Sequence, residues 1–268
     1  MIYLISRIFK RIYFNISYYW HKRIEEEIVQ ASYMDCKILV RANEDVGALI
    51  LAGIFEKGEL DYLIQKVQNQ DVFFDIGANV GLFSIVLAKK NKTVSLHAFE
   101  PIPINACLFK TSLLLNNIHT VHLNECCVGN FNGNVEFSVA SDSAYSSILH
   151  TGWKSEVTKL QVKIITLDSY VKENAIKAIG LMKVDVEGAE RMVLDGAREI
   201  FTNPIMRPRL VLLEMYDKHF EPYKTSISDL IVMMKEYGYK GFCFDQGIKV
   251  EFRPEHYNKN CNVFFELI

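Results

Sequence analysis

Several signatures of common protein classes are missing from this sequence of 268 residues. It contains six cysteines but no Cys-x-x-Cys pair, so it offers neither a disulfide framework nor a dithiol motif. Most of these cysteines lie in apolar segments, and we interpret them as reduced core thiols of a cytosolic protein. The seven histidines show no ligand spacing such as His-Glu-x-x-His, which argues against a structural zinc site.

An excess of charge of either sign is also missing. The chain has 30 lysines and arginines against 32 aspartates and glutamates, which gives a formal net charge of −2. Proteins that follow the phosphates of nucleic acids usually carry a basic surface, so the sequence predicts no nucleic-acid partner. There is no internal repeat and no low-complexity linker, and 50% of the residues are hydrophobic. We therefore expect one large α/β domain with a complete core.

Charged residues interrupt the apolar positions of the amino-terminal segment too often for a membrane span. The segment shows no small-residue cleavage site, so we do not expect a signal peptide. We predict that residues 1–34 form a basic amphipathic helical extension and that residues 35–268 form the main domain. The extension could pack on its own domain or on a second subunit of a homodimer. Alternatively, residues 1–23 could lie at the inner face of a membrane, as a peripheral contact of a cytoplasmic protein.

The best-defined segment of the chain is Asp71–Leu87, with the sequence DVFFDIGANVGLFSIVL. It is typical of a buried strand, a glycine-rich turn and a helix. Asp75 ends the strand, and Gly77, Asn79 and Gly81 follow at alternate positions. In open α/β sheets, ligands bind just beyond the carboxyl ends of the strands. The segment therefore predicts a ligand site with a glycine-rich floor.

Further strands and helices alternate along the chain, which calls for a parallel sheet with right-handed crossovers. An antiparallel insertion with a serine-rich loop interrupts this order between residues 135 and 167. Besides the first strand, we expect strands at 37–40, 93–99, 121–127, 181–185, 210–213, 239–244 and 262–267, and helices at 58–68, 103–117, 168–178, 191–201 and 228–237.

The glycine turn excludes two common nucleotide sites. A P-loop needs Gly-Lys-Ser/Thr and a dinucleotide site needs Gly-x-Gly-x-x-Gly, and neither string is present. Glu100 ends the next strand about 20 residues later, where a carboxylate that binds ribose hydroxyls is expected. Gly77 and Gly81 would let the backbone approach a ligand closely. The carboxylate of Asp75 would suit a cationic ligand better than a pyrophosphate, which favours S-adenosylmethionine over NAD.

At this point the chain resembles the FkbM-type methyltransferases. The resemblance covers roughly Lys37 to Leu267 and implies a class I methyltransferase fold. That is a Rossmann-like, doubly wound α/β sheet of seven strands, mostly parallel with an antiparallel last strand. It also implies S-adenosylmethionine as cofactor and O-methylation of a hydroxyl on a sugar, polyketide or similar metabolite. Together with the amino-terminal segment, it favours a saccharide or glycolipid as acceptor, and polyketides and other small metabolites stay open. The strings that carry the resemblance are FFDIGANVG (73–81), HAFEP (97–101), TLDSYV (166–171), MKVDVEGAE (182–190) and LLEM (212–215), with GIFE (53–56) as the lead-in.

The same resemblance implies where the cofactor binds. The loop residues Asp75, Gly77, Asn79 and Gly81 match the cofactor loop, and Glu100 matches the acid that binds ribose. Further along the chain, Cys127 and Val128 stand where adenine usually packs, although a small residue and an acid are common at these two positions. Ser146, in the serine-rich loop, could contact the cofactor or the acceptor. Glu56 could face the same crevice, or it could be an exposed carboxylate at a helix start.

Catalytic candidates lie at the carboxyl ends of the middle strands. Asp185 and Glu214 end two strands that we expect to be neighbours, and Asp185 could serve either the acceptor or the cofactor side. His219 could act as a general base, because its ordinary pKa suits proton transfer near neutral pH. Two carboxylates could also hold a divalent cation with hydroxyls of the acceptor, but nothing in the spacing requires one, and we predict no metal.

Two other functions fit parts of the sequence. A ribose methyltransferase acting on RNA would also use carboxylates at neighbouring strand ends, but no lysine stands between Asp185 and Glu214 to support it. A non-catalytic binding or scaffold protein could retain the cofactor pocket, although the complete glycine turn and Glu100 argue against this. A methyltransferase with a small-molecule or saccharide acceptor is the prediction that we prefer.

Overall fold

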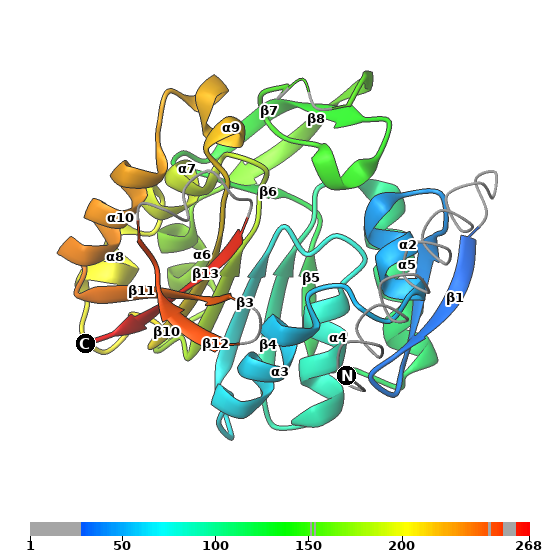
Figure 1. Cartoon of the computed structure of the whole chain (residues 1–268), viewed down its shortest axis with the longest axis horizontal. Helices are drawn as coiled ribbons and strands as arrows, with labels where there is room; N and C mark the ends of the chain where they lie inside the picture. Colours follow the sequence, from blue (N-terminus) through cyan, green and yellow to red (C-terminus); the bar gives the residue numbers. More distant parts are fainter. Residues whose placement is uncertain (1–27, 151, 153, 246–247, 254–260) are drawn as a thin grey trace, which may run out of the picture.

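The computed structural model describes residues 28–150, 152, 154–245, 248–253 and 261–268 (Figure 1). Its centre is an eight-stranded sheet. In spatial order, the strands are β12 (Ile248–Glu251), β11 (Tyr239–Asp245), β13 (Cys261–Leu267), β10 (Leu210–Met215), β9 (Leu181–Val184), β3 (Val72–Ile76), β4 (Ser95–Phe99) and β5 (Val121–Asn124).

The sheet has the predicted class I arrangement. Strands β5, β4, β3, β9 and β10 pair in parallel, and the final strand β13 pairs antiparallel with both β10 and β11. The sheet has eight strands rather than the predicted seven, because β12 forms an additional antiparallel pair with β11. The expected strand 121–127 was too long, since β5 ends at Asn124 and Cys127–Val128 forms β6 in a different sheet.

Helices cover both faces of the sheet, so side chains alternate between two cores. Phe73 of β3 packs in the core beneath one set of helices, and the next residue, Phe74, packs in the other. The first face carries α3 (Lys57–Lys66), α4 (Leu82–Lys90) and α5 (Pro103–Leu115). The second carries α6 (Leu167–Glu173), α7 (Glu190–Asp195), α8 (Arg198–Thr202) and α10 (Ile227–Glu236), which lie on the opposite side in Figure 1.

The helix predicted over residues 191–201 is two helices. The helix is interrupted at Gly196, where an added Cβ atom would lie 1.9 Å from the carbonyl oxygen of Gly129. This close approach places the strand that follows β5 directly against the end of α7. Glycine is therefore needed at position 196 for packing, which the helical pattern of the sequence does not reveal.

The antiparallel insertion is present as a separate three-stranded sheet. Its strands are β6 (Cys127–Val128), β8 (Glu156–Ile165) and β7 (Gly133–Ala140), and β7 pairs antiparallel with β8. The short turn η1 (Ser143–Tyr145) follows β7. We use the name serine loop for residues 141–149. Figure 1 shows this small sheet at one end of the molecule, beyond the main sheet.

The predicted amino-terminal helix over residues 1–34 is wrong for the part that the structure describes. Residues Ile28–Tyr33 form strand β1, which pairs with β2 (Cys36–Arg41), and are not helical. The predicted boundary at 34/35 falls in the turn of this hairpin, where Met34 and Asp35 have positive φ angles. The rest of the predicted helix, including the proposed membrane contact through residues 1–23, lies outside the described residues.

Two further expectations concern cysteines and membranes. Four of the six cysteines, Cys36, Cys126, Cys127 and Cys243, are buried, as expected of core residues. Within the described residues, no helix combines the length and the apolar character that a bilayer crossing needs.

Candidate active site

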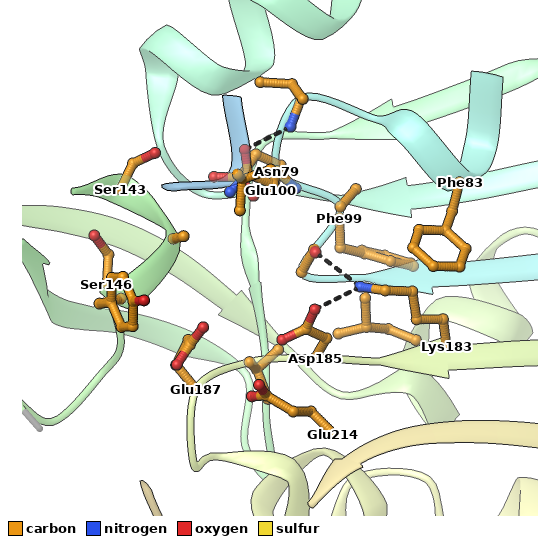
Figure 2. A pocket seen from close by; sticks show the side chains of 18 of the residues that line it. Asn79, Phe83, Phe99, Glu100, Ser143, Ser146, Lys183, Asp185, Glu187 and Glu214 are labelled. Carbon is orange, nitrogen blue, oxygen red and sulfur yellow. Dashed lines mark hydrogen bonds and ion pairs between the residues drawn. The ribbon is translucent and has the colours of Figure 1, made fainter. Parts of the chain in front are cut away.

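A cavity of about 480 Å³ lies at the carboxyl ends of β3, β4, β9 and β10, with the serine loop along one wall (Figure 2). Small-molecule sites commonly have volumes of roughly 300–1,000 Å³, so this cavity has the size of a small-molecule site. Nine of the residues predicted for the site line the cavity: Gly77, Asn79, Glu100, Cys127, Val128, Ser146, Asp185, Glu214 and His219.

Asp75 does not line the cavity, contrary to the prediction. Its side chain is fully buried and points to the α4 side of the sheet, because side chains alternate along β3. Its Oδ2 accepts a hydrogen bond of 2.6 Å from the hydroxyl of Ser84, and its Oδ1 lies 4.0 Å from Nζ of Lys183. Asp75 therefore supports the cavity floor and is not placed to contact a cationic ligand.

The glycine turn is built from left-handed residues, with φ angles of 76° at Gly77, 51° at Asn79 and 80° at Gly81. The reason for the glycines differs from the prediction. A Cβ on Gly77 would lie 1.7 Å from the carbonyl oxygen of Asp185, and one on Gly81 would lie 2.1 Å from the ring of Phe109. Both glycines thus permit close packing inside the protein, and Gly81 does not line the cavity.

Glu100 is a carboxylate of the cavity wall that accepts three hydrogen bonds from the protein. Its Oε2 accepts a hydrogen bond from the backbone nitrogen of Asn79 at 2.8 Å. Its Oε1 accepts from the backbone nitrogen of Ile102 at 3.0 Å and from Nδ2 of Asn105 at 3.3 Å. Burial raises the pKa of Glu100 from 4.5 to about 7, although these donors oppose the shift. These three hydrogen bonds fix the Glu100 side chain at the glycine turn. A fixed carboxylate can distinguish ligands by the positions of their hydroxyl groups.

A polar network connects Glu100 to the serine loop. The hydroxyl of Ser143 lies 3.3 Å from Oδ1 of Asn105, the residue that also contacts Glu100. The backbone nitrogen and hydroxyl of Ser143 bond to the two carboxylate oxygens of Glu44 at 2.9 and 2.8 Å. Ser146 lines the cavity as predicted, but its hydroxyl oxygen accepts a bond from the backbone of Ala140. Hydrogen bonds of Ser143 to Glu44 and of Ser146 to Ala140 therefore hold the serine loop at the cavity wall.

Lys183 lines the cavity and was absent from the predicted site. Its ammonium group is 3.0 Å from Oδ2 of Asp185, 4.0 Å from Oδ1 of Asp75 and 5.2 Å from the centre of the Phe83 ring. Burial lowers the pKa of Lys183, but the carboxylates of Asp185 and Asp75 outweigh it and keep the pKa above its usual value. A lysine inside the apolar strand LMKV was the available signal, because a buried lysine requires a partner.

Glu56 faces the cavity and is not an exposed carboxylate at a helix start, which was the alternative for this residue. It has a left-handed backbone with φ 45° just before α3. Its Oε1 accepts a bond of 2.8 Å from Nδ2 of Asn262 on β13, while no hydrogen bond within the described residues reaches its buried Oε2. Burial, followed by the charge of Asp185, raises the pKa of Glu56 to about 8. Glu56 and Asp185 thus place two carboxyl groups in this part of the cavity.

His219 lies beside the carboxylates of Glu187 and Glu214. We call these three residues the Glu187–Glu214–His219 cluster. Its Nδ1 is 3.1 Å from Oε2 of Glu187 and 3.5 Å from Oε2 of Glu214. The three residues come from the turn after β9, the end of β10 and α9 (Asp217–Phe220). Burial raises the pKa of Glu187 well above its usual value, and the charge of Glu214 adds to this. In Figure 2, the side chains of Asp185, Glu187 and Glu214 gather at one end of the cavity.

The turn that carries Glu187 is strained and is held by the serine loop. Glu187 has φ 56°, and a Cβ on the next residue, Gly188, would lie 2.1 Å from the carbonyl oxygen of His219. The hydroxyl of Ser147 lies 3.1 Å and 3.0 Å from the carbonyl oxygens of Val186 and Glu187. It also lies 2.6 Å from the hydroxyl of Tyr223. Ser147 is therefore a positioning residue for the acidic end of the cavity.

We expect Ser147→Ala to destabilise the protein by about 1–2 kcal/mol, because buried partners lose a hydrogen bond. The free energy of unfolding, measured by urea denaturation, checks this. Ser141→Ala is the matched control, since Ser141 is exposed in the same loop and should change stability little. Equal effects of the two substitutions would show that Ser147 does not hold the turn.

Comparison with known families and proteins agrees with the geometry. A family model described as the methyltransferase FkbM domain matches residues 75–240. The 31-O-demethyl-FK506 methyltransferase FkbM of Streptomyces tacrolimicus is 23% identical over 63% of this chain and 72% of its own length. Methyltransferase 1 of Beauveria bassiana is 26% identical over 50% of this chain, and methyltransferase sdnD of Sordaria araneosa is 26% identical over 52%. The matches span only 61% and 64% of these last two relatives.

Solved structures of low sequence identity also match. A TehB-like S-adenosylmethionine-dependent methyltransferase from Corynebacterium glutamicum is 11% identical, with 82% of this chain and 92% of that chain covered and a TM-score of 0.46. TYW2 of M. jannaschii, in complex with S-adenosylmethionine, is 14% identical, with 91% and 89% covered and a TM-score of 0.44.

Proposed function

We propose, from the premise that this chain belongs to the FkbM methyltransferase family, that it is an S-adenosylmethionine-dependent O-methyltransferase. Its acceptor is a hydroxyl group of a saccharide, glycolipid or similar metabolite. The observation that carries the proposal is the position of Glu100, a fixed carboxylate on one wall of a cavity whose other end is acidic.

The cavity has the donors and surfaces that this cofactor needs. Glu100 can accept a hydrogen bond from a ribose hydroxyl, because its three protein donors use three of the roughly four acceptor positions of the carboxylate and leave one free. Apolar side chains of Ile102, Cys127, Val128 and Phe137 line the adjacent wall and suit the faces of an adenine ring. Toward the other end lie the carboxyl groups of Glu56 and Asp185, and a ligand with ammonium and sulfonium charges would favour the ionised form of Glu56.

The protein's own contribution to methyl transfer is alignment and proton removal. S-adenosylmethionine supplies an activated methyl group, whose bond to sulfur breaks with the electron pair passing to sulfur. Lys183 fixes one oxygen of Asp185, while 23% of the Asp185 side chain stays accessible from the cavity. Asp185 is therefore placed to accept a hydrogen bond from an acceptor hydroxyl and to take its proton.

We expect the affinity for S-adenosylmethionine to rise by about tenfold as pH increases from roughly 6 to 8. Below its pKa of about 7, Glu100 carries a proton and offers one acceptor oxygen fewer to the ribose. Above that pH, the ionised group accepts a charge-assisted hydrogen bond from the ribose. Isothermal titration calorimetry across this range measures the effect.

Glu100→Gln is the matched variant, because it keeps the shape of the side chain and removes its titration. It should bind about tenfold more weakly at roughly pH 8 and show a flatter pH profile, since one charge-assisted hydrogen bond is lost. A variant with the affinity and pH profile of the parent protein would disprove the assignment of Glu100 to the ribose.

The reaction itself is tested with methyl-labelled S-adenosylmethionine and fractionated extracts that contain saccharides and glycolipids. We expect one fraction to gain a methyl group on oxygen, identified by mass spectrometry of the product and its fragments. Cofactor binding without labelling of any fraction would instead favour the non-catalytic binding protein.

A further inference from the structure

The Glu187–Glu214–His219 cluster has the spacing of a metal site. All three ligand-type atoms lie within 4.8 Å of one another, and the two measured contacts of the histidine nitrogen are 3.1 and 3.5 Å. With metal–ligand bonds of roughly 2.0–2.2 Å, two ligands at right angles lie about 3 Å apart. One cation could therefore reach all three atoms after only small side-chain movements.

A second observation points to a ligand at this position. Oε2 of Glu187 is buried, and no hydrogen bond within the described residues reaches it, although it faces the histidine nitrogen at 3.1 Å. Oε2 of the neighbouring Glu190 is also buried and without a hydrogen bond in the described part of the chain. Unsatisfied buried carboxylate oxygens are costly, and a cation is the partner that satisfies them.

From this geometry we propose that Glu187, Glu214 and His219 bind one divalent cation of the Mn²⁺ type. Two carboxylates balance its charge, and the mixture of carboxylate and imidazole suits Mn²⁺ better than Ca²⁺, which prefers oxygen ligands alone. Three protein ligands leave about three positions of an octahedral ion open. Because all three residues line the cavity, a ligand in the cavity could fill the open positions.

The cation defines a class of acceptor, an inference that rests on the proposed function. Adjacent open positions bind two neighbouring oxygens at once, so the acceptor carries a vicinal diol or a hydroxyl beside a carbonyl oxygen. One bound hydroxyl gives its proton to Asp185, and its oxygen forms a bond to the methyl carbon as the carbon–sulfur bond breaks. The electron pair of that bond goes to sulfur, and the cation keeps its oxidation state while it stabilises charge on the oxygen.

This assignment changes the role predicted for His219. Its Nδ1 points at the two carboxylate oxygens, so it acts as a ligand, and the proton goes to Asp185. The strained turn at Glu187 and the bonds of Ser147 to that turn then have a common purpose. They hold one ligand of the cation in place before the cation arrives.

Direct Mn²⁺ binding to the full chain tests the proposal without any acceptor. Protein treated with a chelator and then dialysed is titrated with Mn²⁺, and free Mn²⁺ is followed by electron paramagnetic resonance. We expect one ion per chain, and at least about 100-fold weaker binding for Glu187→Gln and for Glu214→Gln. Glu221→Gln, an exposed acid just after the cluster, is the control and should bind as the parent protein does.

The outcomes separate the metal from the methyl transfer. Absence of Mn²⁺ binding, or binding that the two variants leave unchanged, would overturn the cation site even if the protein methylates an acceptor. Mn²⁺ binding that both variants lose, while their circular dichroism and S-adenosylmethionine affinity stay normal, supports it. If the parent protein binds Mn²⁺ but methylates nothing, the cation site stands and the proposed function fails.

Discussion

Gly77→Ala is expected to cost about 3 kcal/mol or more of unfolding free energy and to remove cofactor binding. A left-handed backbone at an alanine costs about 1–2 kcal/mol by itself. The larger part comes from the new methyl group, which would lie 1.7 Å from the carbonyl oxygen of Asp185. Because the methyl carbon is fixed to the backbone of residue 77 and the oxygen belongs to the backbone of Asp185, neither can rotate away, and the glycine turn and the end of β9 must separate.

The chain contains a matched control for this substitution. Gly53 has a φ angle of +73°, close to the +76° of Gly77, but no atom lies within 4 Å of the position of its Cβ. Gly53→Ala should therefore show the backbone cost alone, about 1–2 kcal/mol. Urea denaturation of both variants separates the two effects, and equal losses would mean that the contact with Asp185 is unimportant.

Lys183→Met is expected to destabilise the protein by about 3–5 kcal/mol, the usual cost of removing one partner of a buried ion pair. The substitution keeps the length of the side chain but leaves Asp75 fully buried with no ammonium group nearby. It also frees Asp185 from its 3.0 Å contact, so any methyl transfer should fall more than cofactor affinity does. Urea denaturation and calorimetry measure the two effects.

A second substitution tests the electrostatic explanation. Adding Asp75→Asn to Lys183→Met should recover part of the lost stability, because the buried charge that had no partner is then neutral. Lys110→Met, at a lysine whose side chain is 52% exposed, is the control and should have little effect. A double variant less stable than Lys183→Met would contradict a direct interaction between Lys183 and Asp75.

The sequence was most informative where one segment determined its own structure. The stretch from Asp71 to Leu87 predicts a strand, a turn and a helix, and β3 and α4 occupy it. Likewise, apolar strands separated by helices were enough to predict a doubly wound sheet. The positions of Glu100, Asp185 and Glu214 at strand ends followed from the same reasoning, because parallel strands end at a common edge.

The rest depended on contacts between distant segments. Whether Asp75 faces the ligand depends on which face of β3 it occupies, and α4 and Lys183 determine that. The meeting of Glu187 with His219 depends on a left-handed turn at a residue other than glycine, which no local pattern predicts. The extra strand β12 and the strand β1 were missed because short edge strands carry weak signals.

The bonds that close the cavity have a consequence for folding as well as for catalysis. Ser143 and Glu44 stand 99 positions apart, and Ser147 and Tyr223 stand 76 apart, so the wall forms only after both halves of the chain have come together. A partly folded chain therefore has no place for the ligand. Binding is then linked to global folding, and a ligand at about 100 times its dissociation constant would stabilise the whole protein by about 2.7 kcal/mol.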